Sequence, residues 1–298
     1  MAGFFGFFDY TKPGRGVRKD EPEKTGFALY FDIFFKRIWK IISLNLFYIL
    51  ASIPAIIIAF FLSDYFIGTL LTLSGINIDG DISLALSILY LLLTVVVLQI
   101  TGSGPASVAM NYVLRKYVND THSWVWSDFI DNIKSNFKQG MGVYLVNVLV
   151  LSLCVIGLLF YTFVMKGMLA YVFRTILLVF TVIFILMQKY TYMLVSGFEL
   201  KFKHIYKNAF ILTIAGLKWN IFSAAVVLAL MYGAYSLVIR IPLVGILAFI
   251  LLYFSVITFT QIFITNNVVK KYILKPMETQ SANENGTEPF EADFEDSV

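Results

Sequence analysis

Charged residues are scarce in this chain of 298 residues: 14% are Asp, Glu, Lys or Arg, against about 25% in a typical soluble domain. Hydrophobic residues make up 59%, and 29 residues are phenylalanine. A soluble domain contains about 45–50% apolar residues, so this chain has more apolar surface than one soluble core needs. Because lipid is the solvent that accepts such surface, we predict an integral membrane protein.

Cysteine and histidine are almost absent, which removes several kinds of site. The single cysteine, Cys154, excludes a disulfide within the chain. The two histidines, His122 and His204, have no second ligand at metal-binding spacing. The chain also lacks a phosphate-binding loop with its lysine and a glycine-rich dinucleotide fingerprint. We therefore expect no enzymatic activity, no metal, no cofactor and no nucleic-acid partner.

Six apolar runs have the ~17–25 residues that a helix needs to cross a bilayer. They lack the alternation of barrel strands, so an all-α polytopic membrane fold is predicted. The last residues, 276–298, form an acidic tail that is predicted to be cytoplasmic and disordered. The preceding membrane domain, 1–275, has spans at about 41–62, 84–102, 141–165, 171–195, 219–239 and 243–265.

Lysine and arginine predict the orientation, because they are enriched in cytoplasmic loops. Of the 23 lysines and arginines, 19 lie before the first span, between an even-numbered span and the next, or after the last span, and Lys189 lies near the inner end of the fourth span. A plasma-membrane protein with both termini in the cytoplasm is therefore predicted. The first outer loop contains no lysine or arginine, which agrees with this orientation. It contains Asp64, Asp79 and Asp81. The three basic residues on the outer side are Lys166, Arg174 and Arg240.

An amphipathic segment precedes spans one, three and five. Segments 27–38, 126–137 and 198–210 have apolar residues at helical spacing, with lysines and polar residues opposite. We interpret the chain as three units, each a cytoplasmic interfacial helix followed by a helical hairpin, which together form a six-helix bundle. Near the start of its first span, each unit has an asparagine: Asn45, Asn147 and Asn220.

The connection between spans two and three contains the most distinctive residues. Pro105 disfavours helix at Gly104, so a break is predicted there, with small residues that allow close helix packing. Asp128 lies near the start of the second interfacial helix, where helix capping and partner docking both account for a carboxylate. The residues considered for docking or for structure are Lys12, Pro13, Gly14, Gly104, Pro105, Arg115, Lys116, Trp126, Asp128 and Phe129.

The polar residues inside the spans are mostly uncharged. No ionisable residue lies near the centre of a predicted span, which argues against an ion-coupled carrier but not against a path for a neutral solute. Hydrogen bonding between helices is the alternative role for the same side chains. The candidates for a polar lining of the bundle are Gln99, Asn147, Gln188 and Gln261.

Short blocks of sequence are spread over the membrane domain at 7–17, 19–22, 45–46, 53–54, 104–106, 112–116 and 126–129. In these blocks the chain resembles the YesL-like family of uncharacterised membrane proteins from Firmicutes. Members of that family are often encoded beside carbohydrate ABC importers, so the resemblance implies a link to sugar uptake. It supplies no catalytic residues.

Two functional hypotheses follow. The first is a non-catalytic accessory or regulatory subunit of a carbohydrate ABC importer, whose partners are the lipid bilayer and the importer subunits or another cytoplasmic or membrane protein. The three interfacial helices are suitable docking surfaces for such a partner, although helices of this kind also simply lie in the headgroup region. The alternative is a stand-alone transporter or channel for a small neutral solute.

Overall fold

The computed structural model describes residues 25–74, 94, 96–274 and 276. These residues form helices and no strands. A short helical stretch at 96–101 precedes α4. The elements are α1 (Gly26–Lys36), α2 (Ile38–Ser74), α4 (Pro105–Val118), α5 (Val125–Ser135), α6 (Phe137–Leu159), η1 (Phe160–Val164), α7 (Met168–Gly197), α8 (Phe202–Ala215), α9 (Leu217–Arg240), α10 (Pro242–Val269) and η2 (Lys270–Leu274).

Five of the described helices are long and apolar enough to cross a membrane. They expose much apolar surface: in α7, for example, Ile176, Val179 and Phe180 are 60%, 51% and 49% exposed. Contiguous apolar surface of this kind marks a face that meets lipid or another protein. The predicted all-α polytopic fold is confirmed. The predicted span 84–102 is described only at 94 and from 96 onward, and the acidic tail lies outside the described residues except at 276.

Helix α2 differs from the sequence-based expectation. It has 37 residues and continues to Ser74, whereas the predicted span ended at 62. Asp64, which we expected in an outer loop, therefore lies within the helix. The physical reason is that a charge limits how far a helix stays in hydrocarbon but does not end the helix. No proline follows Pro54 before Ser74, so the backbone hydrogen bonds continue.

The three predicted units share one local structure. Helices α1, α5 and α8 each meet the following long helix at one non-helical residue: Arg37, Asn136 and Gly216. The three residues have φ of −120°, −106° and −99° with ψ of 14°, 14° and 22°. These angles lie in or near the sparsely populated bridge region, so the helix axis changes direction there. Each carbonyl nevertheless accepts the first hydrogen bond of the next helix, at 2.8–2.9 Å.

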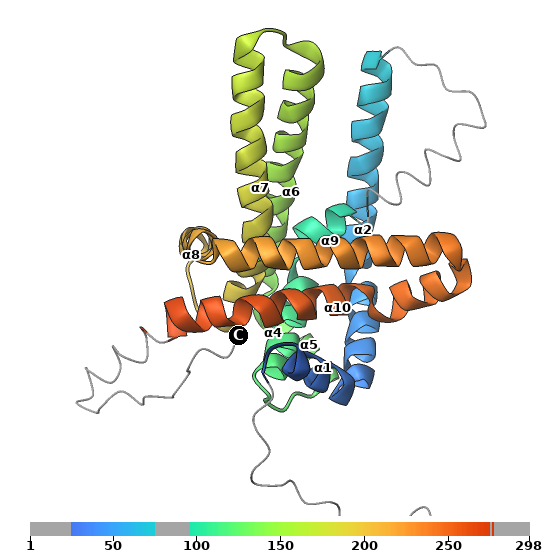
Figure 1. Cartoon of the computed structure of the whole chain (residues 1–298), viewed down its shortest axis with the longest axis vertical. Helices are drawn as coiled ribbons and strands as arrows, with labels where there is room; N and C mark the ends of the chain where they lie inside the picture. The colour runs from blue at the N-terminus through green and yellow to red at the C-terminus, as the bar shows by residue number, and fades with distance from the viewer. Residues whose placement is uncertain (1–24, 75–93, 95, 275, 277–298) are drawn as a thin grey trace, which may run out of the picture.

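The third hairpin runs across the other two. In Figure 1, α2, α6 and α7 are roughly parallel, whereas the α9 and α10 pair crosses them. Helix α10 packs against α9, α2 and α4. Helix α4 is central, because most of its 14 residues are buried and it contacts α2, α5, α6, α7 and α10. The crossing brings α9 and α10 over α4 and the C-terminal part of α7.

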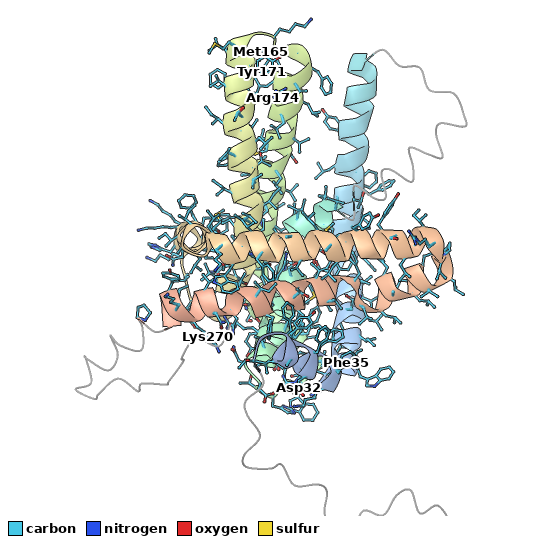
Figure 2. All side chains as sticks on the ribbon, viewed as in Figure 1. Asp32, Phe35, Met165, Tyr171, Arg174 and Lys270 are labelled. Atoms are coloured by element: carbon cyan, nitrogen blue, oxygen red, sulfur yellow. The ribbon has the colours of Figure 1, made fainter. Side chains whose placement is uncertain are left out.

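The turn between α6 and α7 lies far from α1 in the molecule. Met165 and Arg174 lie beside the turn between these helices, at the opposite end of the molecule from Asp32 and Phe35 of α1 (Figure 2). This separation agrees with the prediction that Arg174 and the first interfacial helix lie on different sides of the membrane. Which side is cytoplasmic stays a prediction.

Candidate functional site

Lys116 and Asp128 form an ion pair that joins α4 to α5. Lys116 Nζ lies 3.1 Å from Asp128 Oδ2, and the same oxygen accepts hydrogen bonds from Ser123 Oγ at 2.6 Å and from the Trp124 N–H at 3.1 Å. Trp124 is the N-cap residue of α5, so the carboxylate reaches back to the helix start as in a capping box. Partial burial acts to raise the pKa of Asp128, but the bonds from Ser123 and Lys116 outweigh it and the pKa is lowered.

The neighbouring aromatic residues divide between the core and the surface. Phe129 is 1% exposed, whereas Trp126 is 61% exposed and places its ring 4.9 Å from that of Phe47 in α2. The contacts of this block therefore hold α5 against α4 and α2. Docking of a partner here stays a prediction. Trp126 is the more exposed of the two aromatic candidates for it. Three other candidates lie outside the described residues: Lys12, Pro13 and Gly14.

Gly104 and Pro105 begin α4 where it touches α6. Gly104 has φ 66° and ψ −124°, a conformation that side chains rarely adopt. A Cβ on Gly140 of α6 would lie 2.9 Å from Pro105 Cα, so the two backbones are in contact. At the other end of α4, a Cβ on Gly197 would collide with the Arg115 guanidinium. The break and its flanks thus position α4 between α6 and α7.

The asparagines of the three units are fully buried. Asn45 donates to the Ile250 carbonyl at 2.8 Å and accepts from the Ser255 N–H at 2.8 Å, which joins α2 to α10. Asn220 accepts from Tyr190 Oη–H at 2.8 Å, which joins α9 to α7. A buried amide with both of its groups paired stabilises one arrangement of helices.

Asn147, a candidate lining residue, has the same kind of environment. It donates to Tyr192 Oη at 3.4 Å and accepts from Tyr206 Oη–H at 2.9 Å. Tyr192 in turn donates to the Thr101 carbonyl just before the break. Asn147 therefore belongs to a hydrogen-bond network that joins α6, α7, α8 and the start of the break.

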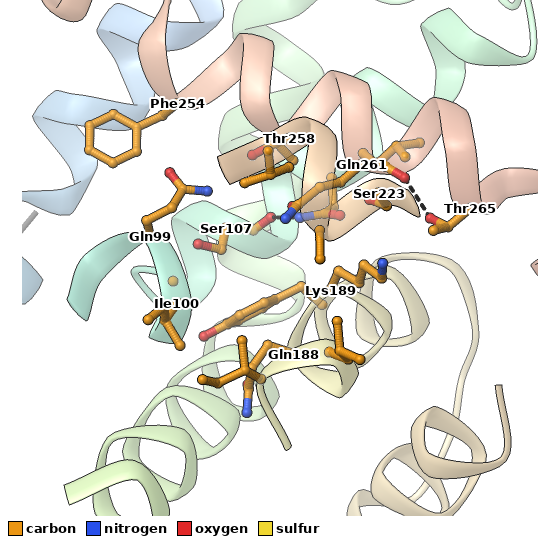
Figure 3. Close-up of a pocket in the computed structure, with 18 of the residues that line it drawn as sticks. Gln99, Ile100, Ser107, Gln188, Lys189, Ser223, Phe254, Thr258, Gln261 and Thr265 are labelled. Atoms are coloured by element: carbon orange, nitrogen blue, oxygen red, sulfur yellow. Dashed lines mark hydrogen bonds between the residues drawn. The ribbon is translucent and has the colours of Figure 1, made fainter. Parts of the chain in front are cut away.

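A cavity of about 350 Å³ lies where the α9 and α10 pair crosses α4 and α7. Three of the four candidate lining residues come together around it: Gln99, Gln188 and Gln261 (Figure 3). They come from three separate helical segments. Asn147 is not part of the lining, but its partner Tyr192 is. The remaining wall is mostly apolar, with side chains such as Val182, Val227, Leu228 and Met231.

Several residues that line the cavity have buried polar atoms without a hydrogen-bond partner. Among the described residues, five buried side-chain polar atoms have no hydrogen bond, and four belong to lining residues: Gln99 Oε1, both amide atoms of Gln188, and Ser223 Oγ. Most buried polar groups in proteins are hydrogen-bonded, so this concentration points to a binding site. These four atoms are themselves buried in the structure.

Two lining residues were missed by the reasoning from sequence. Lys189 was placed near the inner end of its span rather than in a site, and Ser223 carried no signal in an apolar helix. Lys189 lines the cavity, and its Nζ lies 5.6 Å from the centroid of the Tyr190 ring. Periodicity relative to Gln188 and Tyr192 in the same helix was the available signal for Lys189. Ser223 is identified only by its burial, which depends on α9 crossing α7.

The part of the chain that includes the break, α4, α5 and α6 matches a known family model. A DUF624 domain is found at residues 84–162. The family is described as a protein of unknown function, and the match agrees with the YesL-like resemblance of the sequence blocks. The DUF624 segment contains Gln99, the break and the paired Lys116 and Asp128. No curated protein and no solved structure matches the chain.

Proposed function

We propose that this chain is a non-catalytic membrane protein that binds a small hydroxyl-bearing solute in its cavity and serves a carbohydrate ABC importer as an accessory or regulatory subunit. The observation that carries the proposal is the set of unpartnered polar atoms around the cavity. Amides and hydroxyls both donate and accept hydrogen bonds, which suits the hydroxyl groups of a sugar.

The size of the cavity supports a small solute. Its volume of about 350 Å³ lies near the lower end of the ~300–1,000 Å³ that ligand sites usually have. At about 30 Å³ per water molecule, it corresponds to roughly twelve waters. That is space for a monosaccharide rather than for a long oligosaccharide.

The lack of an energy source supports an accessory role. The chain contains no nucleotide-binding loop, and the five spans contain no Asp or Glu that would couple transport to an ion. Uptake against a gradient would thus depend on a second protein that hydrolyses ATP. The resemblance to the YesL-like family implies that this protein is a carbohydrate ABC importer.

A stand-alone transporter or channel for a small neutral solute is the second candidate. The position of the cavity among α4, α7, α9 and α10 favours it, because a transport path needs a polar site inside the bundle. The two candidates differ in what the purified chain does alone. Proteoliposomes that contain only this chain should show no sugar flux if it is an accessory subunit, and flux if it is a transporter.

Sugar uptake and copurification test the main proposal. Gln99→Met and Gln188→Met each remove an amide from the cavity, and a lost hydrogen bond contributes ~0.5–1.5 kcal/mol. The double variant removes two such bonds, about 1–3 kcal/mol in all, and should therefore lower uptake of a labelled sugar by roughly five- to 150-fold. Thr175→Val on the exposed face of α7 is the matched control and should leave uptake unchanged. Normal uptake in the double variant, together with no importer subunit recovered in mild detergent, would overturn the proposal.

A further inference from the structure

We propose that Lys189 pairs with an anionic group of the ligand, so that the cavity takes a hydroxyl-bearing molecule with a carboxylate or a phosphate. The inference rests on the proposed function for the hydroxyl-binding part of the site, and it changes the ligand class from neutral to anionic. The shared chemistry has two sources: a soluble sugar acid, or the headgroup of an acidic lipid.

The charge of the lining carries the inference. Lys189 is the one charged residue among the residues that line the cavity, and no Asp or Glu is present there. The partner found for its ammonium among the described residues is the face of the Tyr190 ring. A partly buried ammonium without a carboxylate is unfavourable, and a bound anion relieves this.

The surroundings of Lys189 supply the rest of the recognition. Gln188, the preceding residue, is 4% exposed and has both amide atoms unpartnered. Gln261 and Thr265 of α10 lie on the opposite wall (Figure 3). One end of the cavity thus combines a positive charge with uncharged donors and acceptors, which is the set that a hydroxy acid or a glycerophosphate requires.

Part of the cavity wall opens toward apolar surface. Leu228 is 65% exposed and Val182 is 49% exposed, and both line the cavity. An acyl chain can therefore lie along this wall, which is the observation in favour of a lipid source. A lysine that only extends toward the headgroup region is the competing explanation for Lys189, and it predicts no dependence of ligand binding on this residue.

The chain offers a matched control for Lys189. Lys218 lies at the start of α9 with its Nζ 5.6 Å from the centroid of the Trp219 ring, the same distance as in the Lys189 and Tyr190 pair. Lys218 does not line the cavity. Lys189→Met and Lys218→Met thus remove the same charge and the same type of ring contact, but only the first changes the site.

The experiment measures binding to the purified full chain in detergent, with two pairs of probes. Glucuronate and glucose differ in a carboxylate, and phosphatidylglycerol and phosphatidylcholine differ in headgroup charge. We expect wild type and Lys218→Met to bind one of the two anions, with affinity at least about tenfold lower in Lys189→Met and restored in Lys189→Arg. Loss of glucuronate binding would identify a soluble acid, and loss of phosphatidylglycerol binding would identify a lipid.

Two results would overturn the inference. One is that neither anion binds more tightly than its neutral counterpart. The other is that Lys189→Met and Lys218→Met change anion binding equally. Either result leaves the proposed function intact if glucose still binds in a Gln188-dependent way. The opposite outcome is also distinguishable. If anion binding requires Lys189, but deletion of the gene for this chain leaves sugar uptake normal, the inference is supported and the proposed function is contradicted.

Discussion

Replacing Gln188 by methionine is expected to stabilise the folded protein, although the change removes a polar group from the candidate cavity. Gln188 is 4% exposed, and neither of its amide atoms has a hydrogen-bond partner. Methionine keeps the unbranched shape of the side chain and leaves no polar atom buried.

The magnitude follows from the missing bonds. A buried polar group without a partner costs ~1–3 kcal/mol, so Gln188→Met should raise the free energy of unfolding by about that amount. Asn220→Leu is the opposite case. It removes the bonds to Tyr190 Oη and to the Thr213 carbonyl, both at 2.8 Å, and leaves those two groups unpaired. We expect a loss of about 2–3 kcal/mol.

Thermal unfolding in detergent, followed by circular dichroism, measures the contrast. For a protein of this size, 1 kcal/mol corresponds to roughly 2–4 °C in Tm. Gln188→Met should therefore raise Tm by roughly 2–12 °C, whereas Asn220→Leu should lower it by a similar amount. If both variants lower Tm alike, Gln188 has partners in the folded state and the reasoning that makes the cavity a binding site is wrong. A gain in stability with a loss of solute binding is the pattern expected of a functional residue.

Two further predictions concern the inner surface and the topology. Asp128→Asn breaks the pair with Lys116 and should lower the free energy of unfolding by ~1–2 kcal/mol at pH 7. Because the pKa of Asp128 is lowered in the folded state, this stabilisation is present above about pH 4 and is lost as the pH falls through the folded pKa. The Tm values of wild type and variant should therefore converge in acid, and a constant difference would contradict the ion pair. Cysteines introduced at Ser135 and at Lys166 should react with an impermeant maleimide from opposite sides of the membrane, and the Ser135 position should react from the cytoplasmic side. The native Cys154 is 3% exposed and should stay unlabelled. Labelling of both introduced cysteines from one side would refute the predicted orientation.

Hydropathy and helical periodicity by themselves determined that the described chain is helical, which helices are long enough to span, and that a short helix precedes α2, α6 and α9. The third of these short helices, α8, begins at Phe202 rather than at the predicted 198. These signals are local, because a run of apolar residues and a stripe at helical spacing are properties of adjacent turns. The break at Gly104 and Pro105 was predictable for the same reason, since proline restricts the residue before it. The end of α2 was not, because the charge of Asp64 is a signal for the membrane boundary and the helix continues to Ser74.

Tertiary structure decided which polar residues form a site. Gln99, Gln188, Gln261 and Asn147 looked alike in sequence, as amides in apolar helices. Asn147 found hydrogen-bond partners in Tyr192 and Tyr206, whereas Gln188 found none and lines a cavity with Gln99 and Gln261. The difference depends on how α9 and α10 cross α4 and α7. Lipid is as apolar as the helix surfaces, so hydropathy does not encode which faces pack together. That choice depends on close contacts such as Gly140 against Pro105 and on buried bonds such as those of Asn45.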